Sequence, residues 1–584
     1  MCGIAGVFAY RPSGNPVDRE ELAAVTEHMR PRGPDDGGTW FSADGRVGLG
    51  ARRLAIIDLS PDGAQPMADA AGELRIVFNG EIYNHRELRE RLERMGAVFR
   101  SSSDTEVLLQ MYRHYGASMV DLLRGMFAFV IWDSRQRQMF VARDPYGIKP
   151  LYVADDGQTF RAASTVKALL AGGKVSAARD LAGTAGFWLT GSVPEPFTIH
   201  QSLRAVAAGT CFFVDEGGRR DENRFFSIAS TLQGASQLES IGTLVHPPAL
   251  MRELITESLS NHLVSDVPVG AFLSSGIDSS VLTALAALQQ PVQTVTLRFE
   301  EFRGDEADEA PLAEIFARER GLAHTTRTVN RDEFLADLPR LFAAMDQPTI
   351  DGTNTWFASK AAAERGLKVA LSGLGGDELF GSYPSFRALP RIVFASRTPL
   401  APRLAAYASR NPKMKELARY GGTWAGAWLI KRGLFLPDDL PSLMGREEAQ
   451  EGLRQLAILE LIGSAIDPDP GTSFGRVAAL EASLYMRNQL LRDTDWASMA
   501  HSLEVRTPLV DATLLRQLAP LLLVEKAGSK QHFAASPIPP LPRYLSGRRK
   551  TGFSIPLARW ASLPPDGTST RMRSWARRVW EHWA

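Results

Sequence analysis

Cys2, the second residue of the chain, has the chemistry of a catalytic nucleophile. Removal of Met1, which a small neighbour such as cysteine favours, would leave a thiol and a free α-amine on one residue. The pKa of such a thiol is about 8.5 and that of the amine about 8, so the amine can take the thiol proton directly or through water. One residue would then supply both nucleophile and base. A buried structural cysteine, which behaves as a small hydrophobic residue, is the alternative for Cys2 taken alone.

Further motifs follow Cys2 through the first half of the chain. In order, they are Cys2-Gly3-Ile4-Ala5-Gly6, Arg32-Gly33-Pro34-Asp35, Arg53-Leu54-Ala55-Ile56-Ile57-Asp58, Asn79-Gly80-Glu81-Ile82-Tyr83-Asn84, Ser103-Asp104-Thr105-Glu106 and Arg143-Asp144-Pro145-Tyr146-Gly147-Ile148-Lys149-Pro150-Leu151-Tyr152. This series resembles the class II, or N-terminal nucleophile, glutamine amidotransferase domain. The chain departs from that family at Pro31, where His is usual, but because Arg-Gly-Pro-Asp is intact we expect a minor effect.

Glutamine hydrolysis explains why such residues would be needed. Attack of a thiolate on the glutamine amide creates a tetrahedral oxyanion, which needs preorganised donors. The resemblance implies that these donors are the Asn79 side chain and the Gly80 N–H, that Arg53 pairs with the glutamine α-carboxylate, and that Asp104 holds its ammonium. The other glutamine-binding residues that it implies are Leu54, Ala55, Ile56, Ile57 and Glu81. Asn79-Gly80 is also a good hairpin turn and Asp104 a possible helix cap, roles that are compatible with catalysis.

A second chemical motif, AFLSSGIDSS at 271–280, lies between a predicted strand and a predicted helix. Its small residues let backbone N–H groups approach a phosphate, and the helix N-terminus adds partial positive charge. Since G-x-x-x-x-G-K-[ST] is absent, this is not a Walker-type loop. It resembles the Ser-Gly-Gly-x-Asp-Ser pyrophosphate loop of ATP pyrophosphatases, with Ser275 where Gly is usual.

Three later segments resemble motifs of the asparagine synthetase family. They are SGLGGDELFG at 372–381, DWASMAHSLEVR at 495–506, which we expect to be helical, and RKTGF at 549–553. With the first half, the resemblance follows the family order through nearly the whole chain.

ATP with Mg²⁺ carries charge that hard oxygen ligands and cations must share. The resemblance implies that Asp278 and Asp377 are the carboxylates of a Mg²⁺–pyrophosphate site and that Lys550 stabilises charge on the departing pyrophosphate. A solvated helix start for Asp377 and a surface position for Lys550 are the alternatives. The residues implied for ATP binding are Leu273, Ser274, Ser275, Gly276, Asp278, Ser279, Leu297, Ser372 and Gly373.

Departures from the family pattern gather on the acceptor side. Leu374 stands where asparagine synthetases generally have an acidic residue, Trp496 where Arg is common, and Thr165 where Glu is frequent. The resemblance implies adenylation of a carboxylate by ATP and attack by ammonia from glutamine, with aspartate as the expected acceptor. The same mechanism on a sugar acid or a secondary metabolite is the nearest alternative. A glutamine or ATP sensor without turnover is a third.

The elements that position these residues differ between the halves. Short strands at 74–78, 126–132 and 139–142, with helices after Asp18 and Ser103, are typical of a sheet-rich domain. Strands at 267–273, 292–299 and 367–371 that alternate with helices at 279–288 and 311–320 predict a parallel sheet, followed by helices from about 387. We therefore expect an α/β protein with an N-terminal nucleophile-type α/β/β/α sandwich at 1–215, a linker at 216–248, and an ATP-pyrophosphatase domain with a parallel sheet and a helical C-terminal part at 249–584.

Composition narrows the setting of the protein. Lys plus Arg and Asp plus Glu each total 66, which gives no support to a nucleic-acid partner. No run approaches about 18 apolar residues, so no membrane span is expected. Two cysteines cannot form a disulfide framework, which favours a reducing cytoplasm. The family resemblance suggests a homodimer.

Overall fold

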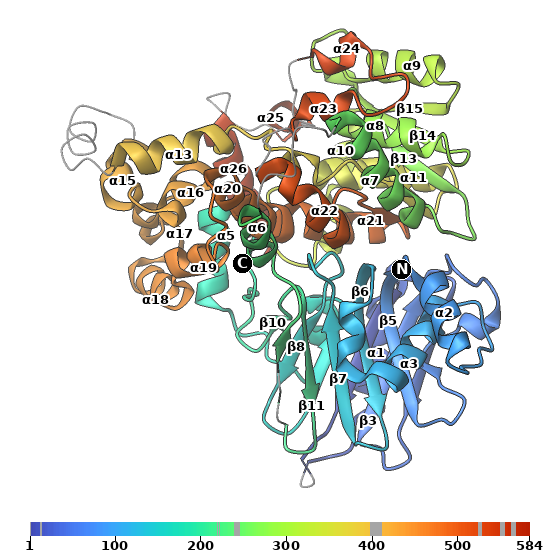
Figure 1. The fold of residues 1–584 in the computed structure, drawn as a ribbon. Helices are drawn as coiled ribbons and strands as arrows, with labels where there is room; N and C mark the ends of the chain where they lie inside the picture. Colours follow the sequence, from blue (N-terminus) through green and yellow to red (C-terminus); the bar gives the residue numbers. More distant parts are fainter. Residues whose placement is uncertain are drawn as a thin grey trace.

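The computed structural model describes residues 2–11, 14–218, 220, 222–238, 246–396, 412–523, 528–548, 555–561 and 568–583. Figure 1 shows a sandwich of strands from the first part of the chain, which packs against a larger body of helices around a second kind of sheet. Among the described residues, no helix is both long and apolar enough to cross a membrane.

Two six-stranded sheets, in which all named strand pairs are antiparallel, form the sandwich. The first sheet has the order β10-β8-β9-β1-β3-β2, from β1 (Cys2–Phe8), β2 (Asp36–Phe41), β3 (Val47–Arg53), β8 (Tyr152–Asp155), β9 (Phe160–Ala163) and β10 (Arg204–Ala205). The second has the order β12-β11-β7-β6-β5-β4, from β4 (Met67–Ala68), β5 (Leu74–Ile82), β6 (Gly125–Asp133), β7 (Gln138–Arg143), β11 (Thr210–Val214) and β12 (Asn223–Arg224).

Helices cover both outer faces of the sandwich. Apolar residues of α1 (Arg19–His28) and α4 (Val166–Ala171) share a core with β1, whereas those of α2 (His85–Arg94) and α3 (Asp104–Tyr115) share one with β5 and β6. A third core, which includes Cys2, lies between the two sheets. The predicted α/β/β/α sandwich is therefore confirmed.

The second half is built on a five-stranded sheet with the order β15-β14-β13-β16-β17, and all neighbours are parallel. Its strands are β13 (Val269–Phe272), β14 (Gln293–Phe299), β15 (Ala323–Val329), β16 (Val369–Leu371) and β17 (Glu504–Arg506). The chain passes outward from β13 to β15 and then returns to the other side of β13 as β16. Ligands of such sheets bind outside the carboxyl ends of the strands where the order reverses. The loops after β13 and β16, which carry the two predicted ATP motifs, meet at this point.

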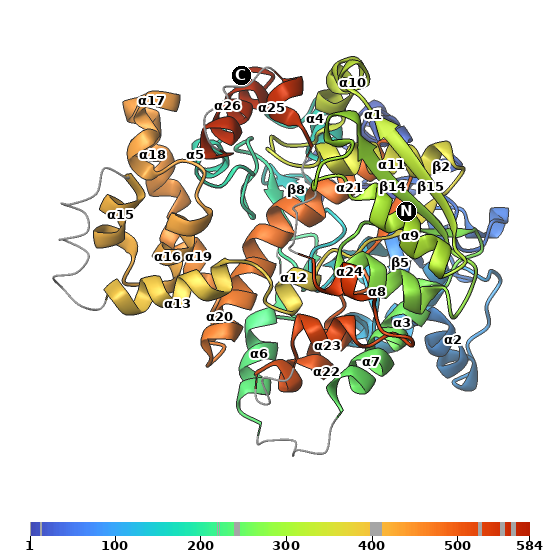
Figure 2. The ribbon, with the colours of Figure 1, turned by 90° about the horizontal axis from the view of Figure 1, so that it is seen from above.

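Helices make up most of the remainder. They are α5 (Leu181–Thr190), α6 (Ile228–Ser236), α7 (Pro247–His262), α8 (Ile277–Ala286), α9 (Ala310–Glu319), α10 (Arg331–Ala344), α11 (Thr353–Glu364), α12 (Gly376–Leu379), α13 (Ser385–Ser396), α15 (Pro412–Tyr420), α16 (Trp424–Arg432), α17 (Pro441–Met444), α18 (Arg446–Leu456), α19 (Ile458–Ser464), α20 (Ser473–Leu480), the π-helix η6 (Glu481–Leu491), α21 (Arg492–Met499), α22 (Ala512–Leu523), α23 (Lys530–Ala534), α24 (Arg543–Ser546), α25 (Leu557–Trp560) and α26 (Thr568–Glu581). Short 3₁₀ turns are η1 (Arg30–Arg32), η2 (Pro61–Gly63), η3 (Gly116–Asp121), η4 (Glu300–Phe302) and η5 (Pro437–Asp439). Figures 1 and 2 both place α13 and α15 to α19 on the side away from β14 and β15.

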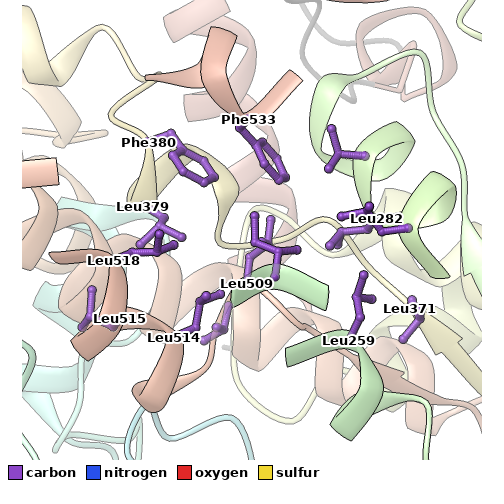
Figure 3. Close-up of a cluster of buried hydrophobic side chains, with 14 of the residues drawn as sticks. Leu259, Leu282, Leu371, Leu379, Phe380, Leu509, Leu514, Leu515, Leu518 and Phe533 are labelled. Atoms are coloured by element: carbon purple, nitrogen blue, oxygen red, sulfur yellow. The ribbon is translucent and has the colours of Figure 1, made fainter. Parts of the chain in front are cut away.

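The core beneath the ATP motifs is drawn in Figure 3, where Leu282, Leu371 and Leu509 lie among buried side chains from several elements. Phe380 and Phe533 stack above them, with ring centroids 4.5 Å apart. Phe380 directly follows α12 and lies three residues after Asp377, whereas Phe533 belongs to α23 and lies three residues after Lys530. Their packing therefore fixes the distance between two charged groups of the candidate ATP site.

The structure corrects three local expectations. Asn79-Gly80 is not a turn, because β5 continues to Ile82, and a Cβ on Gly80 would lie 2.0 Å from the Met126 carbonyl oxygen. Helix α21 ends at Met499, so the expected helix over 495–506 is wrong at its end, where β17 completes the parallel sheet. The stretch read as a linker, 216–248, contains α6, whose Leu232 is buried in the core beside α22.

Candidate active sites

Cys2 and Asn79 meet in the layer between the two sheets. Successive side chains of a strand point to opposite faces. Val77 of β5 lies in the same core as Cys2, so Asn79, two residues further along, faces the same layer. The Cys2 backbone N–H donates a hydrogen bond of 3.0 Å to Asn79 Oδ1. This bond turns the amide group of Asn79 toward the thiol-bearing residue.

The amide nitrogen of Asn79 is the group that an oxyanion would need. Asn79 is completely buried, and its Nδ2 has no hydrogen-bond partner within the described parts of the chain. A buried donor of this kind costs free energy of about 1–3 kcal/mol unless a ligand accepts from it. The position of Asn79 therefore agrees with its predicted oxyanion role, which stays a prediction.

Arg53 lies opposite Cys2 in the pairing of β3 with β1. Its guanidinium donates to the carbonyl oxygens of Ile57 at 3.1 Å and Ser60 at 3.3 Å, so the loop after β3 holds the charge in one place. Leu54, the first residue of that loop, gives its backbone N–H to the Cys2 thiol. The loop that follows the candidate carboxylate-binding cation thus contacts the candidate nucleophile, and it also contains the predicted contacts Ala55 and Ile56.

Asp104 is free for ligand binding because another residue caps its helix. Ser103 Oγ accepts the N–H of Thr105 and serves as the N-cap of α3, so the capping role considered for Asp104 is wrong. Asp104 accepts the N–H of Ile82 at 3.0 Å, and burial raises the pKa of its carboxyl. Glu81 is also buried and lies 3.6 Å from Arg506 of the second half.

Burial, the largest effect, raises the pKa of the Cys2 thiol above its usual range, against the lowering effects of the Leu54 N–H and Arg53. The thiolate is the reactive form, and below the pKa its fraction grows about tenfold per pH unit. We expect the rate of Cys2 alkylation by iodoacetamide, followed by mass spectrometry, to rise through about pH 7 to 9 without a plateau. Cys211, whose pKa burial raises to about 11, is the internal control and should react more slowly. A plateau below about pH 8 would contradict the upward shift.

The second candidate site is the loop between β13 and α8. Ser274 Oγ lies 2.9 Å from Ser279 Oγ and accepts the N–H of Gly276 at 3.1 Å, which closes the loop on itself. Gly373, in the loop after β16, approaches so closely that an added Cβ would lie 2.9 Å from the Ser279 nitrogen. The two predicted phosphate-binding segments are therefore in direct contact.

Lys530 bridges the two predicted metal carboxylates. Its ammonium pairs with Asp278 and, at 3.3 Å, with Asp377. Burial lowers the pKa of Lys530, but attraction to Asp278 and then Asp377 raises it more, so the net shift is upward. Sequence reasoning missed this lysine, because Ser529-Lys530 opens a five-residue helix without a motif of its own.

Several residues predicted to bind ATP lie on strands of the parallel sheet or directly after them. Leu273 ends the β13 segment, with its N–H bonded to Val295 O at 3.0 Å, and Leu297 is buried on β14. Ser372 follows β16, and its N–H bonds Arg506 O at 2.8 Å. Lys550 falls outside the described residues, so its catalytic role stays a prediction.

Comparison with known proteins decides the family. The sequence profile of the glutamine amidotransferase domain matches residues 1–226, and that of asparagine synthase matches residues 250–578. The chain belongs to the asparagine synthase family. "Asparagine synthetase [glutamine-hydrolyzing] 1" of Bacillus subtilis is 31% identical to it over 99% of this chain and 90% of the relative.

Other relatives in the asparagine synthase family carry two kinds of name. A "putative asparagine synthetase [glutamine-hydrolyzing]" of Mycobacterium bovis is 30% identical, covering 96% of this chain and 88% of that protein. "Amidase chry2" of Gibberella zeae is also 30% identical, covering 66% of this chain and 60% of its own length.

Buried ion pairs join the two halves of this family member next to Cys2. Arg32 donates through Nε to the Cys2 carbonyl oxygen at 3.2 Å and through its two terminal nitrogens to Asp495 at 2.7 and 3.0 Å. Both side chains are buried, and a bidentate pair of this kind fixes orientation as well as distance. The carbonyl oxygen of the neighbouring Pro31 accepts a hydrogen bond of 2.7 Å from Ser502 Oγ. The first-half motif with the unusual proline is thus a contact to the second half.

Asp266 forms a second link between the halves. It joins the loop after β3 (residues 54–60, the glutamine loop) to the strand that precedes the phosphate loop. Its N–H donates to Ile56 O at 3.0 Å, and its Oδ2 accepts the Asp58 N–H at 2.8 Å. Asp266 lies three residues before β13, which leads directly to Ser274. A shift of residues 56–58 would therefore act on the segment that supports the ATP loop.

Replacing Asp266 with alanine should loosen the glutamine loop. Loss of a hydrogen bond to a charged acceptor costs about 1.5–3 kcal/mol, so we expect the KM for glutamine to rise about tenfold. The rate of pyrophosphate release with ammonia should stay within about twofold of wild type, because the ATP residues are unchanged. Asp305→Ala, at an exposed position of the same half, is the matched control. An unchanged KM for glutamine would show that the hydrogen bond between Asp266 and Asp58 does not contribute to glutamine binding.

Proposed function

We propose that the protein transfers the amide nitrogen of glutamine to a carboxylate that ATP has activated. Membership in the asparagine synthase family supports this reaction class. The observation that carries it is Asn79, whose Oδ1 holds the Cys2 backbone while its buried amide N–H groups have no partner among the described residues. That arrangement suits a tetrahedral oxyanion formed at Cys2.

The first half reaction would use Cys2 and its own amine. The amine takes the thiol proton, the resulting thiolate attacks the glutamine amide carbon, and the oxyanion accepts from Asn79 and Gly80. Collapse of this intermediate breaks the carbon–nitrogen bond, and the proton passes to the leaving ammonia. Water then hydrolyses the thioester to glutamate. Arg53 and Asp104 would hold the α-carboxylate and the ammonium of glutamine.

The second half reaction would take place at the phosphate loop. A carboxylate oxygen of the acceptor attacks the α-phosphorus of ATP and pyrophosphate leaves. Ammonia then attacks the acyl carbon, AMP leaves, and one proton is released with the amide product. Asp278 and Asp377 fit a Mg²⁺ ion, since both reach the same point in space at Lys530 and Mg²⁺ is bound by one or two carboxylates plus phosphates. Bound with ATP, the ion would neutralise phosphate charge.

We propose two candidates for the acceptor. Aspartate is the acceptor that the names of most of the reported relatives suggest. A different carboxylic acid is the second candidate, because Leu374 offers no acidic group and a relative of similar identity is named an amidase.

The deciding experiment measures pyrophosphate release by the purified protein with Mg-ATP and ammonia, with and without aspartate. Aspartate-dependent release with asparagine as product would establish an asparagine synthetase. No response to aspartate, from protein that still hydrolyses glutamine, would favour the other acids. Asp278→Asn separates both from a sensor, because a synthetase should lose turnover whereas a sensor needs only nucleotide binding.

A further inference from the structure

A large cavity lies between α16, α19, the π-helix η6 and the loop before α11. Its volume is about 770 Å³. Pockets of about 300–1,000 Å³ enclose ligands of drug size. Aspartate, with nine non-hydrogen atoms, would leave most of this space to water.

One wall of the cavity is apolar. It is contributed by α19, η6, α25 and the loop before α11 through Ile350, Ile458, Leu461, Ile462, Leu484 and Leu557. Hydroxyl groups placed against this wall would lack partners, which costs free energy. Polar side chains, among them Ser192, Lys431 and Asn488, line other parts of the same cavity. The apolar wall therefore suits an apolar part of the acceptor.

The cavity lining also includes a carboxylate, that of Asp351. Asp351 accepts the N–H of Gly352 at 2.9 Å and a hydrogen bond from Gln489. Burial raises the pKa of the Asp351 carboxyl. Lys431 and Arg432 line the same cavity, but among the described residues neither forms an ion pair with Asp351, and Arg432 pairs with Glu481. A ligand amine would supply the missing positive charge.

The cavity is connected to the adenylation site through a short chain of contacts. Glu378, next to Asp377, accepts a hydrogen bond of 2.9 Å from Tyr383 OH. The Tyr383 ring lies 5.9 Å from that of Tyr485, which lines the cavity. Tyr485 belongs to the eleven-residue π-helix η6, a rare form that is found mainly at functional sites.

A departure from the family pattern supports one wall of the cavity. Trp496 packs on Gly352, where an added Cβ would lie 2.5 Å from its ring, and its Nε1 donates to Asp493 at 2.9 Å. Gly352 has a φ of 86° and follows Asp351 directly. The unusual tryptophan thus fixes the turn that presents Asp351 to the cavity.

We infer that the acceptor is a carboxylic acid larger than aspartate, with an amino group that pairs with Asp351 and an apolar body along α19 and η6. The inference rests on the proposed function and names its substrate class.

The test compares aspartate with L-aspartyl-L-phenylalanine methyl ester, which keeps the amine and the β-carboxylate and adds an apolar body. Pyrophosphate release with Mg-ATP and ammonia is measured for both. We expect kcat/KM for the ester to exceed that for aspartate at least about tenfold, since apolar contacts of this size discriminate by about 10- to 200-fold.

Leu461→Trp narrows the cavity and should lower kcat/KM for the ester about tenfold while leaving that for aspartate within about twofold. Leu288→Trp, at a position that is 67% exposed, is the matched control. Preference for aspartate, or equal loss with both acids in Leu461→Trp, would overturn the inference and leave the proposed function intact. Release with neither acid, from protein that hydrolyses glutamine, would overturn the inference and return the search to other carboxylic acids, whereas loss of glutamine hydrolysis as well would contradict the proposed function.

Discussion

Cys2→Ala is expected to abolish glutamine hydrolysis while ammonia still supports product formation. Without the thiol no thioester can form, and removal of a catalytic nucleophile lowers turnover by at least about 10³-fold. Glutamine-dependent pyrophosphate release should fall by the same factor. With added ammonia, pyrophosphate release should stay within about twofold of wild type, since the phosphate loop is a separate site.

The structure makes this separation a demanding test. Cys2 is joined to the second half through Arg32, which binds the Cys2 carbonyl rather than its thiol. Alanine keeps that carbonyl and the 3.0 Å bond from the backbone N–H to Asn79. Cys211→Ala, which removes a buried thiol on β11, is the matched control and should leave both activities unchanged. Loss of ammonia-dependent release in a folded Cys2→Ala protein would refute the two-site account.

Local patterns predicted the elements that carry most of the candidate residues. Strands β5, β6 and β7 follow apolar runs that end in turn residues, and β13, β14 and β16 follow the strand–helix alternation. The alternation along β5 also explains how Asn79 reaches Cys2, since both face the layer between the sheets. These features depend on residues close together in sequence, where periodicity is informative.

Strands β15 and β17 were missed because charge or polarity replaces their apolar signal. The β17 strand consists of Glu504, Val505 and Arg506, and its two charged side chains pair with each other in a buried position. Arg506 also donates to the carbonyls of His262 and Val264 at 2.7 and 2.6 Å. A buried ion pair on an edge strand therefore has the sequence signature of a polar surface segment.

Asp266 and Lys530 mark the limit of motif-based prediction at the sites. Neither belongs to a recognisable pattern, and each acquires its partners through folding. Asp266 is separated from its partner Asp58 by 208 positions in the sequence, and Lys530 from Asp377 by 153. The contact of Asp266 depends on how the two halves pack together, and that of Lys530 on how α23 lies relative to α12. Local sequence spacing encodes neither.

Lys530→Met is expected to lower ammonia-dependent pyrophosphate release by at least about 10²-fold. Its ammonium is shared by Asp278 and Asp377, and the two carboxylates would otherwise face each other and the phosphates of ATP. Removing this charge leaves the departing pyrophosphate less stabilised, so the loss should appear in kcat more than in the KM for ATP. Glutamine hydrolysis should stay within about twofold, since Cys2 and its partners are unchanged.

Two further variants distinguish charge from shape at this position. Lys530→Arg retains the charge and should recover at least about tenfold of the lost rate, because a guanidinium can also bridge two carboxylates. Lys174→Met, which removes an exposed lysine paired with Asp18, should have no effect. If Lys530→Met kept wild-type release, the positive charge between the carboxylates would be dispensable, and the site would need another cation for pyrophosphate. Lys550 would then be the residue to replace next, since the family resemblance gives it that role.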